Sequence, residues 1–106
     1  MSWQTFIEER EEGDIRLRFS RSDARGWATA DLLALVDSAL GFVAGETAEP
    51  SHLNVTWLRP TQEADVVALA RVIRRDGPRV HAEAWLFSHA VVEPMLHATA
   101  SFAVPE

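Results

Sequence analysis

Asp37 is the residue whose setting in this sequence points most directly to chemistry. It lies within LLALVDSALGFVAG, residues 32–45, a stretch in which ten of the fourteen residues are apolar and two are glycine. A carboxylate buried among apolar side chains is costly unless it is paired, hydrogen-bonded or protonated. Two roles therefore fit Asp37: a structural hydrogen bond, or a general base or nucleophile in a site that excludes water.

Arginine supplies all ten basic residues of the chain, and half of them lie in its middle part. These five are Arg59, Arg71, Arg74, Arg75 and Arg79. Because a guanidinium group binds phosphate in bidentate geometry, five such groups close in space would suit a phosphorylated ligand. The alternative is that they are solvated side chains at strand ends. The net charge of −6 argues against general nucleic-acid binding.

The four histidines do not predict a metal site. They are His52, His81, His89 and His97, and their spacing is not that of a compact ligand set. Only His89 and His97 could face each other, if the last two strands pair through a turn near Val92 or Glu93. The sequence also has no nucleophile elbow, no phosphate-binding loop and no dinucleotide fingerprint.

Three elements are predicted in the part of the chain that ends with the Asp37 segment. Residues 3–11 have the spacing of a short helix, and residues 14–20 alternate apolar and polar side chains as in a half-buried strand. Residues 29–44 predict a longer helix, with Thr29 as its N-cap and Gly45 as its C-cap. Since this helix is apolar nearly all round, we expect the rest of the protein to enclose it.

Four strand-like segments follow the long helix. They are residues 51–60, 64–75, 79–89 and 95–105, and the Asp76-Gly77 pair predicts a hairpin between the second and the third. Strands joined by such short links favour an antiparallel meander, at least in part. The predicted fold class is α+β, with one domain over residues 1–106.

Composition also limits where the protein works. The chain has no cysteine, no basic segment followed by an apolar signal region, and no apolar run of 18 residues. We therefore expect a cytoplasmic protein that does not bind a membrane.

Several stretches resemble a known family in the same order. LLALVDSALG is similar to the helix of hotdog acyl-CoA thioesterases of the phenylacetyl-CoA and 4-hydroxybenzoyl-CoA thioesterase types. VTWLRPT resembles the strand that follows, RRDGPRV a hairpin and ATASFAV the final strand, and some of these elements also resemble medium-chain acyl-CoA thioesterase II. The resemblance covers residues 14–104 and implies a hotdog fold, in which a curved antiparallel sheet wraps around a central helix.

The resemblance also implies a site and a reaction. It makes Asp37 the general base or nucleophile that attacks an acyl-CoA thioester at a dimer interface, with backbone N–H groups at Thr29 and Ala30 polarising the carbonyl. Family members usually carry His-Gly-Gly where this chain has Ala28-Thr29-Ala30, and a β-branched threonine does not readily take the positive φ that glycine allows. The alternative is a non-catalytic hotdog module that binds acyl-CoA or serves only in assembly.

Partners follow from the same resemblance. Coenzyme A enters as part of the substrate, no separate cofactor or metal is implied, and Arg59, Arg71, Arg74, Arg75 and Arg79 are expected to hold its phosphates. Two chains are expected to join through the strand after the long helix. In residues 79–89, Ala82, Ala84 and Leu86 should face the helix, whereas Trp85 and Phe87, with Leu69 and Ile73, should form an outer apolar patch that pairs two dimers into a tetramer.

Overall fold

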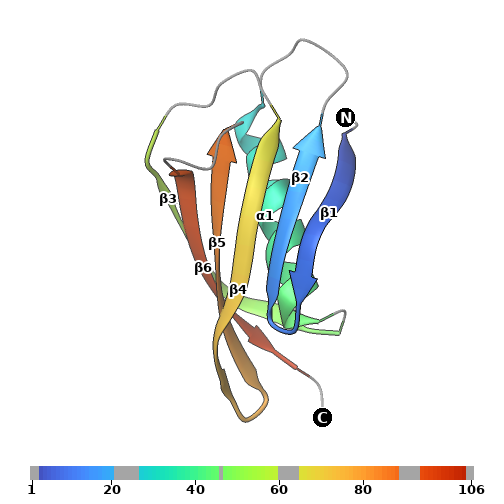
Figure 1. The fold of residues 1–106 in the computed structure, drawn as a ribbon. Helices are drawn as coiled ribbons and strands as arrows, with labels where there is room; N and C mark the ends of the chain where they lie inside the picture. Colours follow the sequence, from blue (N-terminus) through green and yellow to red (C-terminus); the bar gives the residue numbers. More distant parts are fainter. Residues whose placement is uncertain (1–2, 21–26, 46, 60–64, 89–93, 105–106) are drawn as a thin grey trace.

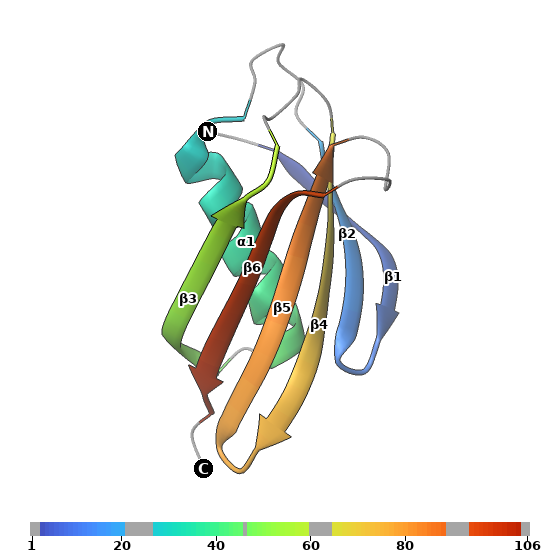
Figure 2. The same ribbon diagram turned by 90° about the vertical axis from the view of Figure 1, so that its left-hand side faces the viewer.

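A computed structural model of the chain describes residues 3–20, 27–45, 47–59, 65–88 and 94–104. These residues form one antiparallel sheet of six strands, in the order β1-β2-β4-β5-β6-β3, and one helix, α1, that crosses one face of the sheet (Figures 1 and 2). The elements are β1 Gln4–Glu11, β2 Asp14–Ser20, α1 Thr29–Ala44, β3 Glu49–Trp57, β4 Val66–Asp76, β5 Arg79–Ser88 and β6 Pro94–Ala103. The predicted long helix, the strand before it and the four strands after it are confirmed.

The first element differs from the prediction. A helix was expected over residues 3–11, but Gln4–Glu11 form strand β1, which pairs with β2 through a turn at Gly13. A helix this short is marginal by itself, whereas a strand beside β2 gains a row of backbone hydrogen bonds. Within β1, Ile7 lies opposite the buried Leu17, on the same face of the sheet as α1.

Alternate side chains of the sheet pack under α1. The buried set includes Ile15, Leu17 and Phe19 of β2, Ala68 and Ala70 of β4, and Ala82, Ala84 and Leu86 of β5. The inward direction predicted for Ala82, Ala84 and Leu86 is confirmed. Because alanine has so little side chain, the middle of the sheet lets α1 lie close to it.

The N-terminus of α1 begins one residue earlier than expected. Ala28, not Thr29, is the N-cap, and the backbone N–H of Ala28 donates to Oδ2 of Asp31 at 3.0 Å. Asp31 is almost fully buried and also carries the negative charge that suits the first turn of a helix. This is the contact that the third helical residue supplies in a capping box, whereas the hydroxyl that an N-cap threonine would supply has no counterpart at Ala28. Gly45 is the C-cap, as predicted.

The hairpin between β4 and β5 depends on one glycine. Asp76 pairs with Arg79, so Gly77 and Pro78 form the turn, and Gly77 has a φ of 61°. Proline fixes the negative φ of the second turn position, and glycine takes the positive φ of the first. We expect Gly77→Ala to lower the free energy of unfolding by about 1–2 kcal/mol, measured by urea denaturation. An added Cβ meets nothing within 4 Å, so any loss of stability would come from the positive φ and not from a steric clash. An unchanged urea midpoint would contradict the prediction.

The two edge strands of the sheet have opposite character. Four consecutive residues of β1, Glu8 to Glu11, are charged and exposed. After Glu49, β3 contains no aspartate, glutamate, lysine or arginine, and its Leu53 and Trp57 are about half exposed. Charged side chains discourage strand pairing at an edge, whereas an apolar edge invites it. The edge at β3 is therefore the one suited to a partner.

Candidate functional site

Asp37 is exposed in the single chain, so the prediction that the protein encloses α1 on all sides is wrong. The helix packs on β2, β4, β5 and β6, and no Cα atom in its described residues lies within 8 Å of one in β1 or β3. Contact on one side leaves a stripe uncovered along the other. Exposed Ala30, Leu33 and Asp37, and half-buried Gly41, follow one another at helical spacing along this stripe.

Helix geometry places this stripe on the β3 side of α1. Leu33 and Phe42 are nine residues apart, which is two and a half turns, so they lie on opposite sides of the helix. Phe42 lines a pocket together with residues of the β1–β2 turn. Leu33, and Asp37 one turn later, must therefore lie on the side of α1 that is turned toward β3, a strand with no Cα atom within 8 Å of the helix.

The inner face of β3 carries apolar side chains on the same side of the sheet as α1. Leu53, Val55 and Trp57 pair with Ala100, Ala98 and Leu96 of β6, which are buried on the face that carries α1. Paired residues project to the same face of a sheet, so the three β3 side chains do too. Trp57 is 47% exposed, although it lies on the face that elsewhere forms the core. Residues 53–57, LNVTW, alternate apolar and polar side chains, and this alternation could have predicted that Leu53, Val55 and Trp57 share one face of the strand.

The first turn of α1 offers backbone N–H groups on the same side. The first intrahelical bond runs from Leu32 N–H to Ala28 C=O, so the N–H groups of Thr29 and Ala30 have no acceptor within the helix. Both residues are helical, a conformation with negative φ, and so do not require glycine. Seven residues separate Ala30 from Asp37, which is two turns and about 10 Å of axial rise, and the aspartate side chain tilts back toward Ala30.

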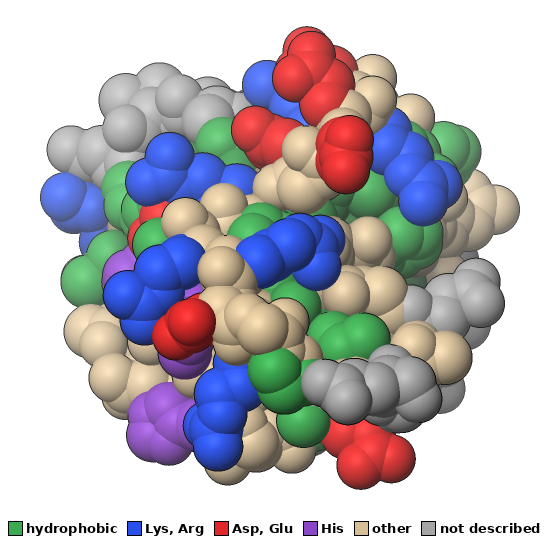
Figure 3. All heavy atoms as spheres, turned by 90° about the horizontal axis from the view of Figure 1, so that it is seen from below, with side chains coloured by type: hydrophobic (Ala, Val, Ile, Leu, Met, Phe, Trp, Pro, Cys, Tyr) green, Lys and Arg blue, Asp and Glu red, His purple; other side chains and the backbone are tan. Residues whose placement is uncertain are grey.

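The five arginines do not form one cluster. Arg59 follows β3 at the end of the sheet where α1 begins, whereas Arg79 pairs with Ala103 at the opposite end. Seven strand residues, about 23 Å, separate these two levels of the sheet. Seen from the end where the β4–β5 hairpin lies, arginine side chains are spread among a few carboxylates (Figure 3).

The arginines also lie on different faces. Arg75 pairs with the buried Val80 and so lies on the α1 face, but Arg71 pairs with Glu83, on the outer face. Nε of Arg71 is 2.6 Å from Oε2 of Glu83, and Arg74 lies opposite His81 on that outer face too. The expectation that all five arginines frame one site is wrong, because alternate positions of a strand point to opposite faces. Of the four on β4 and β5, Arg75 is the one on the face of Asp37.

The outer face carries a polar cluster that sequence reasoning missed. Glu83 is 8% exposed, and its Oε1 lies 3.2 Å from Nε2 of His97, while Arg71 holds the other oxygen. The ring of Trp85 stacks on His97, with 4.9 Å between centroids. This cluster covers part of the apolar patch expected there. Phe87 lies on the outer face as predicted, because it pairs with Val67 and alternates with the inward Leu86, but it is only 8% exposed. A tetramer formed through this face stays a prediction, with Trp85→Glu as its test.

The predicted facing of His89 and His97 cannot be placed, because His89 lies outside the described residues. His97 pairs with Trp85 across the β5–β6 ladder. Within the ranges the structure describes, no three histidine, cysteine or acidic side chains come together as metal ligands. Among those same residues, no helix is long and apolar enough to cross a membrane.

No protein-family profile matches the chain, and no curated protein matches it significantly. Solved structures, in contrast, match nearly the whole chain. A candidate thioesterase from Silicibacter sp. TM1040 gives a TM-score of 0.83 at 17% identity, covering 97% of this chain and 80% of that chain. Zebrafish thioesterase superfamily member 2 gives a TM-score of 0.81 at 12% identity, covering 95% of this chain and 81% of that chain.

A third similar structure is a mutant of the phenylacetic acid degradation protein PaaI from Thermus thermophilus. It gives a TM-score of 0.82 at 16% identity, covering 95% of this chain and 93% of that chain. All three comparisons span nearly the whole chain, so they concern the entire sheet and helix and not a local motif. With its six-stranded antiparallel sheet around one helix, the chain has the fold of these thioesterase-superfamily structures, which is the hotdog fold predicted from its sequence.

Proposed function

We propose that this protein hydrolyses acyl-CoA thioesters and that Asp37 acts on the thioester as general base or nucleophile. One observation carries the proposal: Asp37 is an exposed carboxylate midway along α1, one turn after the exposed and apolar Leu33. A carboxylate from which a partner and a substrate exclude water is a stronger base than one in solution. The fold shared with thioesterase-superfamily structures supports the same reading.

The site would be completed by a second copy of the chain. Among the described residues, strand β3 pairs only with β6, carries no charged side chain after Glu49 and has no helix within 8 Å of its inner face. Two chains related by a twofold axis could pair through β3 and so extend the sheet from one protomer into the next. Each protomer would then cover the Asp37 surface of the other, and the site would lie at the dimer interface in the cytoplasm.

The reaction would be addition of water followed by loss of the thiol. As general base, Asp37 takes a proton from water while the water oxygen bonds to the carbonyl carbon. The carbon–sulfur bond then breaks, and the sulfur of coenzyme A leaves and receives the proton. As nucleophile, the carboxylate would instead displace the thiol and form an anhydride that water cleaves. In either case, the N–H of Ala30 would stabilise the negative charge on the carbonyl oxygen.

The apolar groups around Asp37 would receive the acyl chain. Leu33, Leu53 and Trp57 offer hydrophobic surface on the same side of the chain, and each buried methylene of an acyl group gains about 0.8 kcal/mol. This surface is what distinguishes an acyl thioester from a small hydrophilic substrate. The chain length that fits would depend on how much of the surface a partner chain also covers.

Hydrolysis of a panel of acyl-CoA thioesters tests the proposal. Release of free thiol is followed for acetyl-, hexanoyl-, decanoyl- and benzoyl-CoA, and binding of free CoA is measured in parallel by calorimetry. We expect turnover of at least one substrate. If none is hydrolysed while CoA binds, the enzyme assignment is wrong and the alternative of a non-catalytic binding module takes its place.

A further inference from the structure

The first turn of α1 is held by a buried residue on each side. Trp27, just before the helix, is 7% exposed and Asp31 is 4% exposed, whereas residues 28–30 between them are exposed. The ring of Trp27 packs at a tilt on that of Trp3, with 5.9 Å between the centroids. A carboxylate buried as deeply as that of Asp31 is costly to keep, so its position calls for an explanation that hydrophobic packing does not give.

Capping at this end of α1 is one-sided. In a complete capping box, the side chain of the third helical residue accepts the N–H of the N-cap, and the N-cap side chain accepts an N–H from the second or third helical residue. Oδ2 of Asp31 makes the first contact, 3.0 Å from the nitrogen of Ala28. The methyl group of Ala28 cannot make the second. Among the described residues, no carbonyl outside the helix accepts the N–H of Ala30 either, so this donor stays available at the exposed surface.

We propose that Asp31 is a positioning residue for the thioester site. Its carboxylate fixes the N-cap through the N–H of Ala28 and leaves the N–H of Ala30 to the carbonyl oxygen of the substrate. That donor is therefore held in place before the substrate arrives, and preorganised donors stabilise a developing negative charge without the cost of reorganisation. Because Asp31 is buried, it acts through the turn and does not touch the substrate. The inference rests on the proposed function for the identity of the reacting group.

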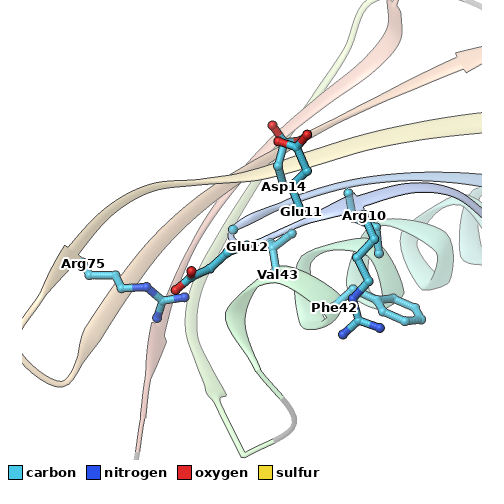
Figure 4. Close-up of a pocket in the computed structure, with 9 residues that line it drawn as sticks. Arg10, Glu11, Glu12, Asp14, Phe42, Val43 and Arg75 are labelled. Atoms are coloured by element: carbon cyan, nitrogen blue, oxygen red, sulfur yellow. The ribbon is translucent and has the colours of Figure 1, made fainter.

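The opposite end of α1 provides a control. Gly45 caps the helix there with a φ of 115°, a conformation that strains any residue with a Cβ. Nearby, Phe42 and residues of the β1–β2 turn line a cavity of about 360 Å³ (Figure 4). This cavity lies on the other side of α1 from Asp37, since five helical residues separate Phe42 from Asp37 by about 140° around the axis. Gly45→Ala should therefore destabilise the same helix at a distance from the thioester site.

Kinetics of hydrolysis test the inference on the best thioester substrate. We expect Asp31→Ala to lower kcat about tenfold or more with KM within about twofold of the original, because a displaced donor weakens binding of the transition state alone. Asp31→Asn keeps an oxygen that can accept the N–H of Ala28, and it should retain at least about a third of the original kcat. Gly45→Ala should leave kcat and KM unchanged although its urea midpoint falls.

Ala28→Asn completes the capping box and should separate stability from activity. The new amide oxygen can accept an N–H of the first turn, so the urea midpoint should rise. The same oxygen would compete with the carbonyl of the substrate, so kcat should fall about threefold or more. The inference is overturned if kcat of Asp31→Ala falls no further than that of Gly45→Ala, or if Ala28→Asn raises the midpoint at an unchanged kcat.

A measurement by nuclear magnetic resonance does not depend on turnover. The backbone amide proton of Ala30 is followed while either of two CoA thioethers is added: one carries a ketone carbonyl one methylene away from the sulfur, and the other carries an alkyl chain of the same length without a carbonyl. We expect a shift with the ketone only, kept in Asp31→Asn and lost in Asp31→Ala. Equal shifts with both compounds, or none with either, overturn the inference. A shift specific to the ketone without hydrolysis of any thioester refutes the proposed function alone.

Discussion

Replacing Asp37 with asparagine is expected to lower kcat for thioester hydrolysis by about 100-fold or more. Asparagine keeps the size of the side chain and its polarity but cannot accept a proton from water or form an anhydride, and loss of a general base typically has an effect of this size. Since Asp37 is exposed in the single chain, the change should leave folding intact. The measurement is kcat and KM for the best substrate of the panel, with a denaturation midpoint for each protein.

The control is Glu9→Gln, which removes an exposed carboxylate from β1, on the far edge of the sheet. It makes the same change in net charge and should leave kcat unchanged. A rate in Asp37→Asn within twofold of the original would remove Asp37 from the chemistry. A rise in KM with unchanged kcat would give it a part in substrate binding only.

Replacing Leu53 with glutamate is expected to separate the proposed dimer and abolish turnover. Leu53 is 46% exposed on the inner face of β3, so a partner joined through this edge would bury the new carboxylate. Burying a charge without a counter-charge is expensive, and twofold symmetry introduces it twice in each interface. We expect the dimer dissociation constant to rise at least about 100-fold, measured by light scattering over a concentration series.

Ile7→Glu is the matched control for this experiment. Ile7 is 49% exposed, and it lies on the same face of the sheet in the opposite edge strand, β1. The substitution adds the same charge at a similar exposure, and the protein should remain a dimer with its original rate. A monomer in the unmodified protein at micromolar concentration would refute assembly through β3, as would an unaltered dimer in Leu53→Glu.

The long helix and the strands after it could be predicted because their patterns are long. Sixteen residues of α1 repeat the helical spacing, and its cap at Gly45 is a strong local signal. Strand β1 could not be predicted, since Trp3, Phe6 and Ile7 satisfy the helical spacing in a segment too short to exclude a strand. What decided β1 was pairing with β2, a contact made outside the segment itself.

The candidate site was only partly visible in the sequence. Asp37 could be singled out because a carboxylate interrupts an apolar run, but the same run suggested burial, and α1 packs on one side only. The inner face of β3 was missed because its strand partner decides the direction of Leu53 and Trp57. The arginines were grouped by sequence alone, whereas strand alternation sends Arg74 and Arg75 to opposite faces.

The difference between the two edge strands would limit how far the sheet could extend from chain to chain. A sheet with two apolar edges could add chain after chain and grow into a fibre. Here Glu8, Glu9 and Glu11 line one edge, so a copy that approaches it meets like charges. A twofold pairing through β3 leaves β1 at both outer ends of the joined sheet. Growth would then stop at two chains, and a variant that neutralises these three glutamates should form larger aggregates.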